Sequence, residues 1–154
     1  MRTAINDMTT AHVRLKMTTE NNKDLAVKAF DAFNKQDEAG LAAVFSPKWA
    51  AEFTRMLPGV YALWSGHRIE VADMIAEDDK VWCRLRTSGT HAGEWMGIPP
   101  SGRQWTNTGV WFFRITDGRI VEVEWKMDDM NLLRQLGGTI SPPHDSAAQP
   151  QSGA

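Results

Sequence analysis

The chain has 154 residues, of which 42% are hydrophobic and 23% are charged, a length and composition that suit one folded domain with a buried core and exclude a second full-sized domain. The formal net charge of −2 is not typical of nucleic-acid-binding proteins, and the one cysteine excludes an internal disulfide. No apolar run approaches the roughly 18 residues of a membrane-spanning helix, so we expect neither nucleic acid nor a membrane as a partner.

The two ends of the chain differ in composition from the middle. Residues 1–18 carry more basic than acidic side chains and no continuous apolar stretch, so a secretory signal is not predicted and we expect a cytoplasmic protein. We interpret this segment as a flexible N-terminal extension, with a mitochondrial presequence as the alternative. Residues 139–154 are rich in Pro, Ser, Ala and Gln, which predicts a disordered tail and leaves 19–138 for the domain.

The first half of the domain predicts helices. Apolar side chains with helical spacing mark a helix over 20–35, at positions Leu25, Ala26, Ala29, Phe30 and Phe33. Asp37 is placed to cap a short second helix over 37–46. A third helix is predicted over 49–57, closed by the dipeptide Pro58-Gly59.

The second half predicts strands, because apolar and polar side chains alternate. Asp-Gly at 117–118 is typical of a tight hairpin turn, and Gly137-Gly138 would end a short last helix over 129–136. Helices followed by hairpin-linked strands predict an α+β fold, a curved antiparallel sheet packed on two to three N-terminal helices. The predicted strands cover residues 68–76, 80–91, 105–115 and 120–128.

Three stretches together resemble the SnoaL-like polyketide cyclases, a family of the NTF2-like superfamily. They are GTHAGEWMGIPPSGR at 89–103, FRITDGRIVE at 113–122 and DDMNLLRQLG at 128–137. The likeness covers about residues 22–138. It implies an NTF2-like α+β cone that is a homodimer or homotetramer, and an apolar small molecule as substrate.

The resemblance also implies a chemistry that needs no cofactor. The family's cyclases close a ring by an intramolecular aldol reaction, in which a carboxylate removes a proton alpha to a carbonyl. The family's acid/base Asp lies nine residues before the Gly of QLG, which is Asp128 here. The alternative is that Asp128 or Asp129 caps the last helix. The four histidines are scattered without paired carboxylates, so no metal site is predicted.

Two further catalytic candidates come from strand alternation. Alternation groups Glu124 with Asp128, and two carboxylates in one apolar cavity would raise the pKa of one of them; the alternative is a surface Glu. His91 could bind a substrate carbonyl or orient Asp128. It could equally be a structural residue whose ring nitrogens form hydrogen bonds within its own hairpin. We interpret His67 as a solvated loop residue.

Aromatic side chains divide between the pocket and an interface. Alternation places Trp82 and Trp125 on the outer side of the sheet, where they would join two subunits or fill the core. The expected walls of the substrate pocket are Trp111, Phe113, Tyr61, Trp49 and Phe33, with Tyr61 as a candidate oxyanion donor.

Two function classes remain. The first is a cofactor-independent cyclase or isomerase that acts on a carbonyl-rich apolar molecule such as a polyketide. The second is a non-catalytic ligand-binding or dimerisation domain, and a cofactor-free hydroxylase is a further alternative. The first helix has no Tyr for the oxyanion site of a ketosteroid isomerase, and no strand shows the Asp–Arg–Asp set of limonene-type epoxide hydrolases.

Overall fold

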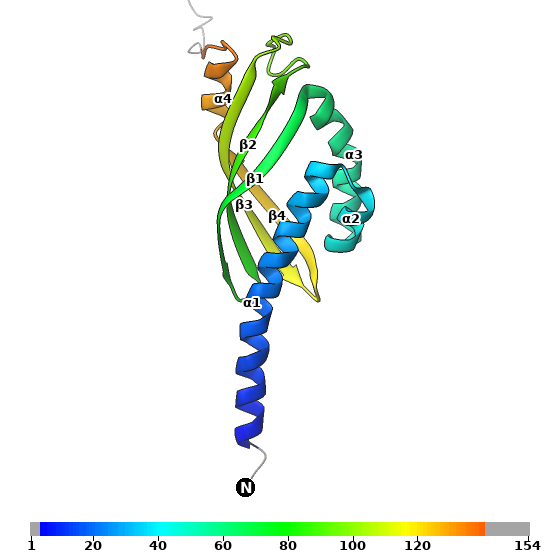
Figure 1. The fold of residues 1–154 in the computed structure, drawn as a ribbon, viewed down its shortest axis with the longest axis vertical. Helices are drawn as coiled ribbons and strands as arrows, with labels where there is room; N and C mark the ends of the chain where they lie inside the picture. The colour runs from blue at the N-terminus through cyan, green and yellow to red at the C-terminus, as the bar shows by residue number, and fades with distance from the viewer. Residues whose placement is uncertain (1–3, 141–154) are drawn as a thin grey trace, which may run out of the picture.

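The computed structural model describes residues 4–140 of the chain, with side chains from residue 19 onward. It confirms the α+β fold, in which helices are followed by one antiparallel sheet (Figure 1). In chain order the elements are α1 (Ala4–Lys35), α2 (Glu38–Val44), α3 (Pro47–Leu63), β1 (Trp64–Glu77), β2 (Lys80–His91), β3 (Gln104–Thr116), β4 (Arg119–Met127) and α4 (Asp129–Gln135).

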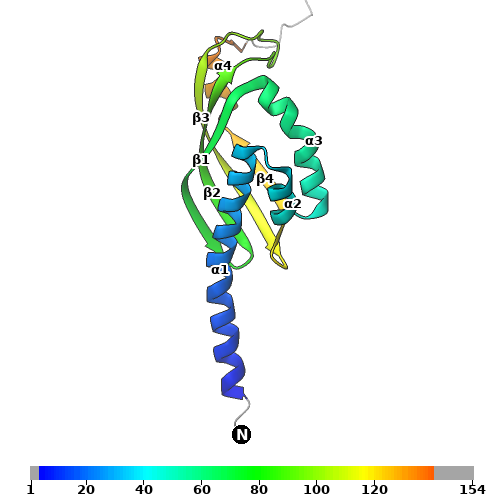
Figure 2. The ribbon, with the colours of Figure 1, turned by 45° about the vertical axis from the view of Figure 1, so that its right-hand side comes forward.

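The sheet has the strand order β1-β2-β3-β4, so each strand pairs with its neighbours along the chain. It is curved, and α1, α2 and α3 lie against one of its faces in both views (Figures 1 and 2). Alternate side chains of β2, namely Val81, Cys83 and Leu85, are fully buried against these helices. We call this the inner face of the sheet and the opposite one the outer face. No helix in the described part of the chain is long and apolar enough to cross a membrane.

Aromatic rings join the helices to the inner face. Phe33 of α1 lies 4.8 Å from Phe53 of α3 and 5.7 Å from Phe45, which follows α2 (ring centroids). Phe45 in turn meets Phe113 of β3 at 6.1 Å. All four rings are fully or almost fully buried. Burying such a side chain contributes about 1.5–3 kcal/mol, so this cluster explains why the apolar faces of three separate helices converge on one site.

The free edge of β1 is closed by α1 rather than by another strand. The Asn34 amide donates to the carbonyl of Ile69 and accepts from its N–H, both at 2.8 Å. Farther along the same edge, Asn22 Nδ2 donates to the carbonyl of Asp78 at 3.0 Å. Buried backbone groups need such partners, and these bonds fix α1 along the edge strand.

The predicted turn between β3 and β4 is confirmed. Asp117 and Gly118 both have positive φ, 49° and 72°, as the twist of a two-residue hairpin requires. The β2 bounds agree with the predicted range 80–91, and Asp37 caps α2 by accepting the N–H of Gly40 at 3.0 Å.

Two predicted helix boundaries are wrong. α1 begins at Ala4 and not at residue 20, because no Gly or Pro interrupts the chain before Gly40. α3 continues through Pro58 to Leu63 instead of ending at Leu57. A proline inside a helix costs about 3 kcal/mol, and the apolar residues on both sides of it offset this cost by packing on the sheet. Residues 141–154 lie outside the described part, so the loose tail stays a prediction.

A bulge in β4 reverses the predicted facing of its side chains. Arg114 pairs with Glu122 but Ile115 pairs with Ile120, which leaves Val121 as an extra residue. One extra residue moves every later side chain to the other face. Trp125 therefore lies on the inner face beside Trp111, and Glu124 is exposed on the outer face opposite Phe112. The predicted outer placement of Trp125 and the predicted cavity placement of Glu124 are both wrong, and Glu124 is a surface residue, as the stated alternative has it.

Trp82, by contrast, is 47% exposed on the outer face, as alternation predicts. It lies 4.8 Å from Phe112 (ring centroids), and the ladder places Ile75 at its other side. Together with Val110 these residues form what we call the outer apolar patch. Exposed patches of this kind are typical of interaction sites.

Association of two copies through the outer apolar patch stays a prediction. We expect a dimer in sedimentation velocity at micromolar concentration, and a monomer for Trp82→Lys, because a charge buried in this patch would have no partner. The urea midpoint of the variant should not depend on protein concentration, whereas that of a dimeric wild type should rise with it, because association stabilises the folded state. A monomeric wild-type protein would contradict the prediction.

Candidate functional site

A cavity of about 230 Å³ lies between α3 and the inner face of the sheet. α3 contributes Met56, Leu57 and Val60 to its wall, and Phe33 of α1 closes one side. Most of its other wall residues are apolar side chains of the strands. Such a concave, mainly apolar space with few polar groups is the usual form of a small-molecule site.

Two stacked indoles form a flat wall of this cavity. Trp111 of β3 and Trp125 of β4 are directly paired across the strands, with ring centroids 5.3 Å apart and planes 26° from parallel. Trp111 is also held by Phe33 at 5.5 Å. Trp125 is 41% exposed, and β4 is an edge strand. The cavity therefore opens to solvent along this edge, and its wall suits a planar ligand.

The Tyr61 hydroxyl on this wall already has a protein partner. It donates to the backbone carbonyl of Phe33, and burial raises the pKa of the Tyr61 hydroxyl above its ordinary value. Tyr61 is thus a neutral wall residue, and its hydroxyl proton is used in the hydrogen bond to α1. The predicted role of oxyanion donor would require this bond to break.

Two other polar side chains on the wall, His67 and Thr87, have no hydrogen bond to protein in the described part of the chain. Thr87 Oγ1 is buried without a partner. Burial lowers the pKa of the His67 imidazole below its ordinary value. The sequence interpretation of His67 as a solvated loop residue is wrong. Alternation from the buried Ile69, two residues later, would have placed it on the inner face.

The structure brings three of the five predicted wall residues to the cavity: Phe33, Tyr61 and Trp111. The other two lie nearer the β3–β4 turn. Phe113 is fully buried and packs on Phe30 at 5.5 Å (ring centroids). Trp49 stacks on Phe53 at 5.6 Å, and its Nε1 donates to the carbonyl of Val121 at 3.0 Å.

The three predicted catalytic residues are not brought together. Asp128 is exposed and caps α4, accepting the N–H of Asn131 at 3.0 Å, so it and not Asp129 is the cap. Glu124 is on the outer face. His91 is fully buried, with Nδ1 3.0 Å from Ser101 Oγ and its ring against Trp64. None of the three belongs to the cavity wall.

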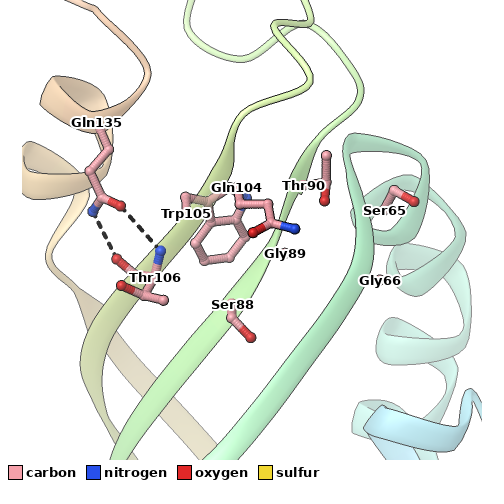
Figure 3. Close-up of a pocket in the computed structure, with 9 residues that line it drawn as sticks. All are labelled: Ser65, Gly66, Ser88, Gly89, Thr90, Gln104, Trp105, Thr106 and Gln135. Carbon is pink, nitrogen blue, oxygen red and sulfur yellow. Dashed lines mark hydrogen bonds between the residues drawn. The ribbon is translucent and has the colours of Figure 1, made fainter.

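A second hollow of about 410 Å³ lies on the outer face, between α4 and the start of β1 (Figure 3). Hydroxyl and amide side chains line it, including Ser88, Thr90 and Gln104. β4 pairs with β3 only from Gly109 onward, so the backbone of Thr106 has no strand partner on that side. The Gln135 side chain supplies one instead: it accepts the Thr106 N–H at 3.1 Å and donates to the Thr106 carbonyl at 2.8 Å (Figure 3). No titratable side chain lines this groove, so acid–base chemistry is better placed in the inner cavity.

Metal binding has no support among the side chains that the structure describes. No group of three His, Cys, Asp or Glu residues within them is arranged to hold an ion. The chemistry available at the inner cavity is that of an imidazole, two hydroxyls and an apolar wall.

Comparison with solved structures gives close likeness in fold. AclR from Streptomyces galilaeus, named as a candidate hydroxylase, is 26% identical with a TM-score of 0.70, over 82% of this chain and 87% of its own. IdmH from Streptomyces antibioticus, named as a candidate polyketide cyclase, is 26% identical with a TM-score of 0.68, over 75% and 98%. TsrD from Streptomyces laurentii is 24% identical with a TM-score of 0.71, over 78% and 97%.

No curated protein matches the chain significantly. A family model, however, matches residues 24–136. This range includes all four strands and α4. It also contains the three stretches in which the sequence resembles the family, except for Gly137 at the end of the third. The chain belongs to the SnoaL-like polyketide cyclase family.

Proposed function

We propose that this protein is a cofactor-independent acid–base enzyme, of the cyclase or isomerase type, whose substrate is an apolar carbonyl compound such as a polyketide. The observation that carries the proposal is the inner cavity, with its stacked Trp111–Trp125 wall and two polar side chains without protein partners. An aldol ring closure needs a proton removed from carbon and a proton returned to oxygen, in a site that excludes water.

The cavity volume restricts what can be enclosed. At about 230 Å³ it lies below the range of about 300–1,000 Å³ that is common for ligand pockets. It suits the one or two rings that react, while the rest of a longer substrate would extend past Trp125 into solvent. The likeness to IdmH, a candidate polyketide cyclase, supports this substrate class.

A second candidate function, a cofactor-free hydroxylase, is supported by the equal sequence identity to AclR. The two functions share the cavity and differ in whether oxygen enters the product. Turnover that continues under nitrogen supports the cyclase, and turnover that requires dioxygen supports the hydroxylase. A protein that binds ligands without any turnover would be the non-catalytic domain.

The first prediction for this site concerns ligand binding. We expect 2-acetylnaphthalene, a neutral two-ring ketone, to bind in the cavity and to be detected by calorimetry. Trp125→Ala should raise its Kd about tenfold, because a stacked aromatic contact and its buried area are lost. Trp82→Ala is the matched control, since Trp82 is exposed to a similar degree, 47% against 41%, on the other face. Equal effects of the two substitutions would contradict the assignment of the cavity.

The second prediction concerns Asp128 as the cap of α4. Asp128→Ala should lower the free energy of unfolding by about 1 kcal/mol, because the N–H of Asn131 loses its acceptor. Asp128→Asn should change it by only a few tenths of a kcal/mol, since Asn is also a good N-cap. Urea unfolding measures both. If Asn destabilised as much as Ala, the carboxylate charge would have a role that capping does not explain.

A further inference from the structure

We propose that His67 is a catalytic residue of the inner cavity, where its imidazole accepts the proton that leaves the substrate carbon. This inference rests on the proposed function and assigns its acid–base step to a residue outside the three stretches that carry the family resemblance. It also gives the unpartnered Thr87 hydroxyl a role in the same step.

A bulge in β1 lets Trp64 and His67, three positions apart, both face the cavity. Ser65 pairs with Thr90 and Arg68 pairs with Ser88, so Gly66 and His67 together face the single residue Gly89. Gly66 has a φ of 64°, which favours glycine over residues with a side chain. Bulges are frequent beside active sites because they redirect a side chain.

The absence of a side chain at Gly89 makes room for this arrangement. A Cβ at Gly89 would lie 3.5 Å from His67 Cα and 3.1 Å from Trp105 Cζ2. Trp105 therefore covers Gly89, as Figure 3 shows. Its ring lies 5.9 Å from the His67 ring, and Tyr61 meets that ring edge-on at 5.8 Å. The imidazole is thus held between two aromatic rings.

The His67 nitrogens are free for substrate. Within the described part of the chain, no hydrogen bond of the imidazole to a protein group is found, and only ring contacts hold it. The other titratable side chain of the cavity wall, Tyr61, gives its proton to the Phe33 carbonyl. Of the two, His67 is therefore the one that can accept a proton without breaking an existing bond.

The surroundings keep the imidazole neutral. Burial lowers the pKa of His67 below its ordinary value, so the ring has an unprotonated nitrogen at pH 7. Tyr61 is the titratable group that faces it from α3, and burial keeps that hydroxyl neutral by raising its pKa. Thr87 of β2 and Trp105 of β3 carry no charge. A neutral imidazole has a free nitrogen lone pair and is well suited as a general base.

Thr87 is placed to receive the negative charge that develops. It pairs directly with Ile69, two residues beyond His67 on the same face. His67 itself lies in the bulge opposite Gly89, two residues from Thr87 along β2, and both side chains line the same cavity. A carbonyl compound in this cavity can therefore present its alpha C–H to the imidazole and its oxygen to Thr87. The buried Thr87 Oγ1 lacks a protein partner and would donate to the carbonyl oxygen.

The step is balanced without any co-reactant. The substrate C–H bond breaks, its proton moves to a His67 nitrogen, and its electron pair becomes an enolate whose oxygen accepts a hydrogen bond from Thr87. The enolate carbon then forms a bond to the second carbonyl carbon, whose oxygen becomes an alkoxide. The imidazolium returns its proton to that alkoxide, which restores the neutral base.

A general probe tests the base without knowledge of the natural substrate. When a base removes the C3 proton of 5-nitrobenzisoxazole, the N–O bond breaks and a coloured cyanophenolate forms. We expect the wild-type protein to exceed free imidazole at equal concentration, and His67→Gln to lose at least tenfold in rate. Asp128→Asn should keep the wild-type rate. The acid limb of the wild-type pH–rate profile should lie below pH 6.5, because the active form is the neutral imidazole.

Binding of 2-acetylnaphthalene separates the possible failures. If the wild-type protein does not bind it, the proposed function fails. If it binds to both wild type and His67→Gln, but their elimination rates are equal or neither exceeds free imidazole, the His67 assignment is overturned and the cavity assignment is not. Loss of the rate in Asp128→Asn alone would also overturn it.

A measurement on the unaltered protein covers the case in which His67→Gln does not fold. Histidine NMR signals are followed with pH, with and without 2-acetylnaphthalene. We expect the His67 signals to titrate below pH 6.5 and to shift when the ketone binds. A His67 ring that titrates as in a free peptide and ignores the ketone would overturn the proposal.

Discussion

The packing of Phe33 is the interaction on which the fold and the cavity both depend. Its ring meets Phe45, Phe53 and Trp111 at 5.7, 4.8 and 5.5 Å (centroids), and so joins all three N-terminal helices to the sheet. Its backbone carbonyl accepts the Tyr61 hydroxyl, and its side chain closes one side of the cavity. Truncation of a buried Phe typically costs about 3–5 kcal/mol. Phe33 therefore belongs to both the core and the cavity wall, so a substitution of Phe33 changes the stability of the fold and the shape of the cavity together.

Two single-residue bulges decide which chemistry faces the cavity. The extra residue in β4, Val121, turns Trp125 inward and Glu124 outward. The extra residue between Ser65 and Arg68 of β1 lets both Trp64 and His67 face the cavity. The strands on either side of each bulge keep ordinary pairing, so the cost of the irregularity is local. The site thus arises from local breaks in alternation, and β1 has one further register shift, between Val71 and Asp73.

Much of the fold follows from the sequence, because alternation, the Asp117-Gly118 turn and helical spacing are local signals. The site follows less well. A bulge changes facing without changing composition, so strand alternation alone predicts the wrong faces for Glu124 and Trp125. The position of Asp128 matches the family motif, yet its carboxylate caps α4. The helix α3 passes through Pro58 because packing on both sides outweighs a local breaker signal.

The central claim is that ligands bind in the inner cavity and not in the groove on the outer face. A crystal structure with 2-acetylnaphthalene tests it most directly. We expect the naphthalene ring against Trp111 and Trp125, with the ketone oxygen within hydrogen-bond distance of Thr87 Oγ1. A ketone found instead beside Gln135 and Thr106, or on the outer apolar patch, would contradict it.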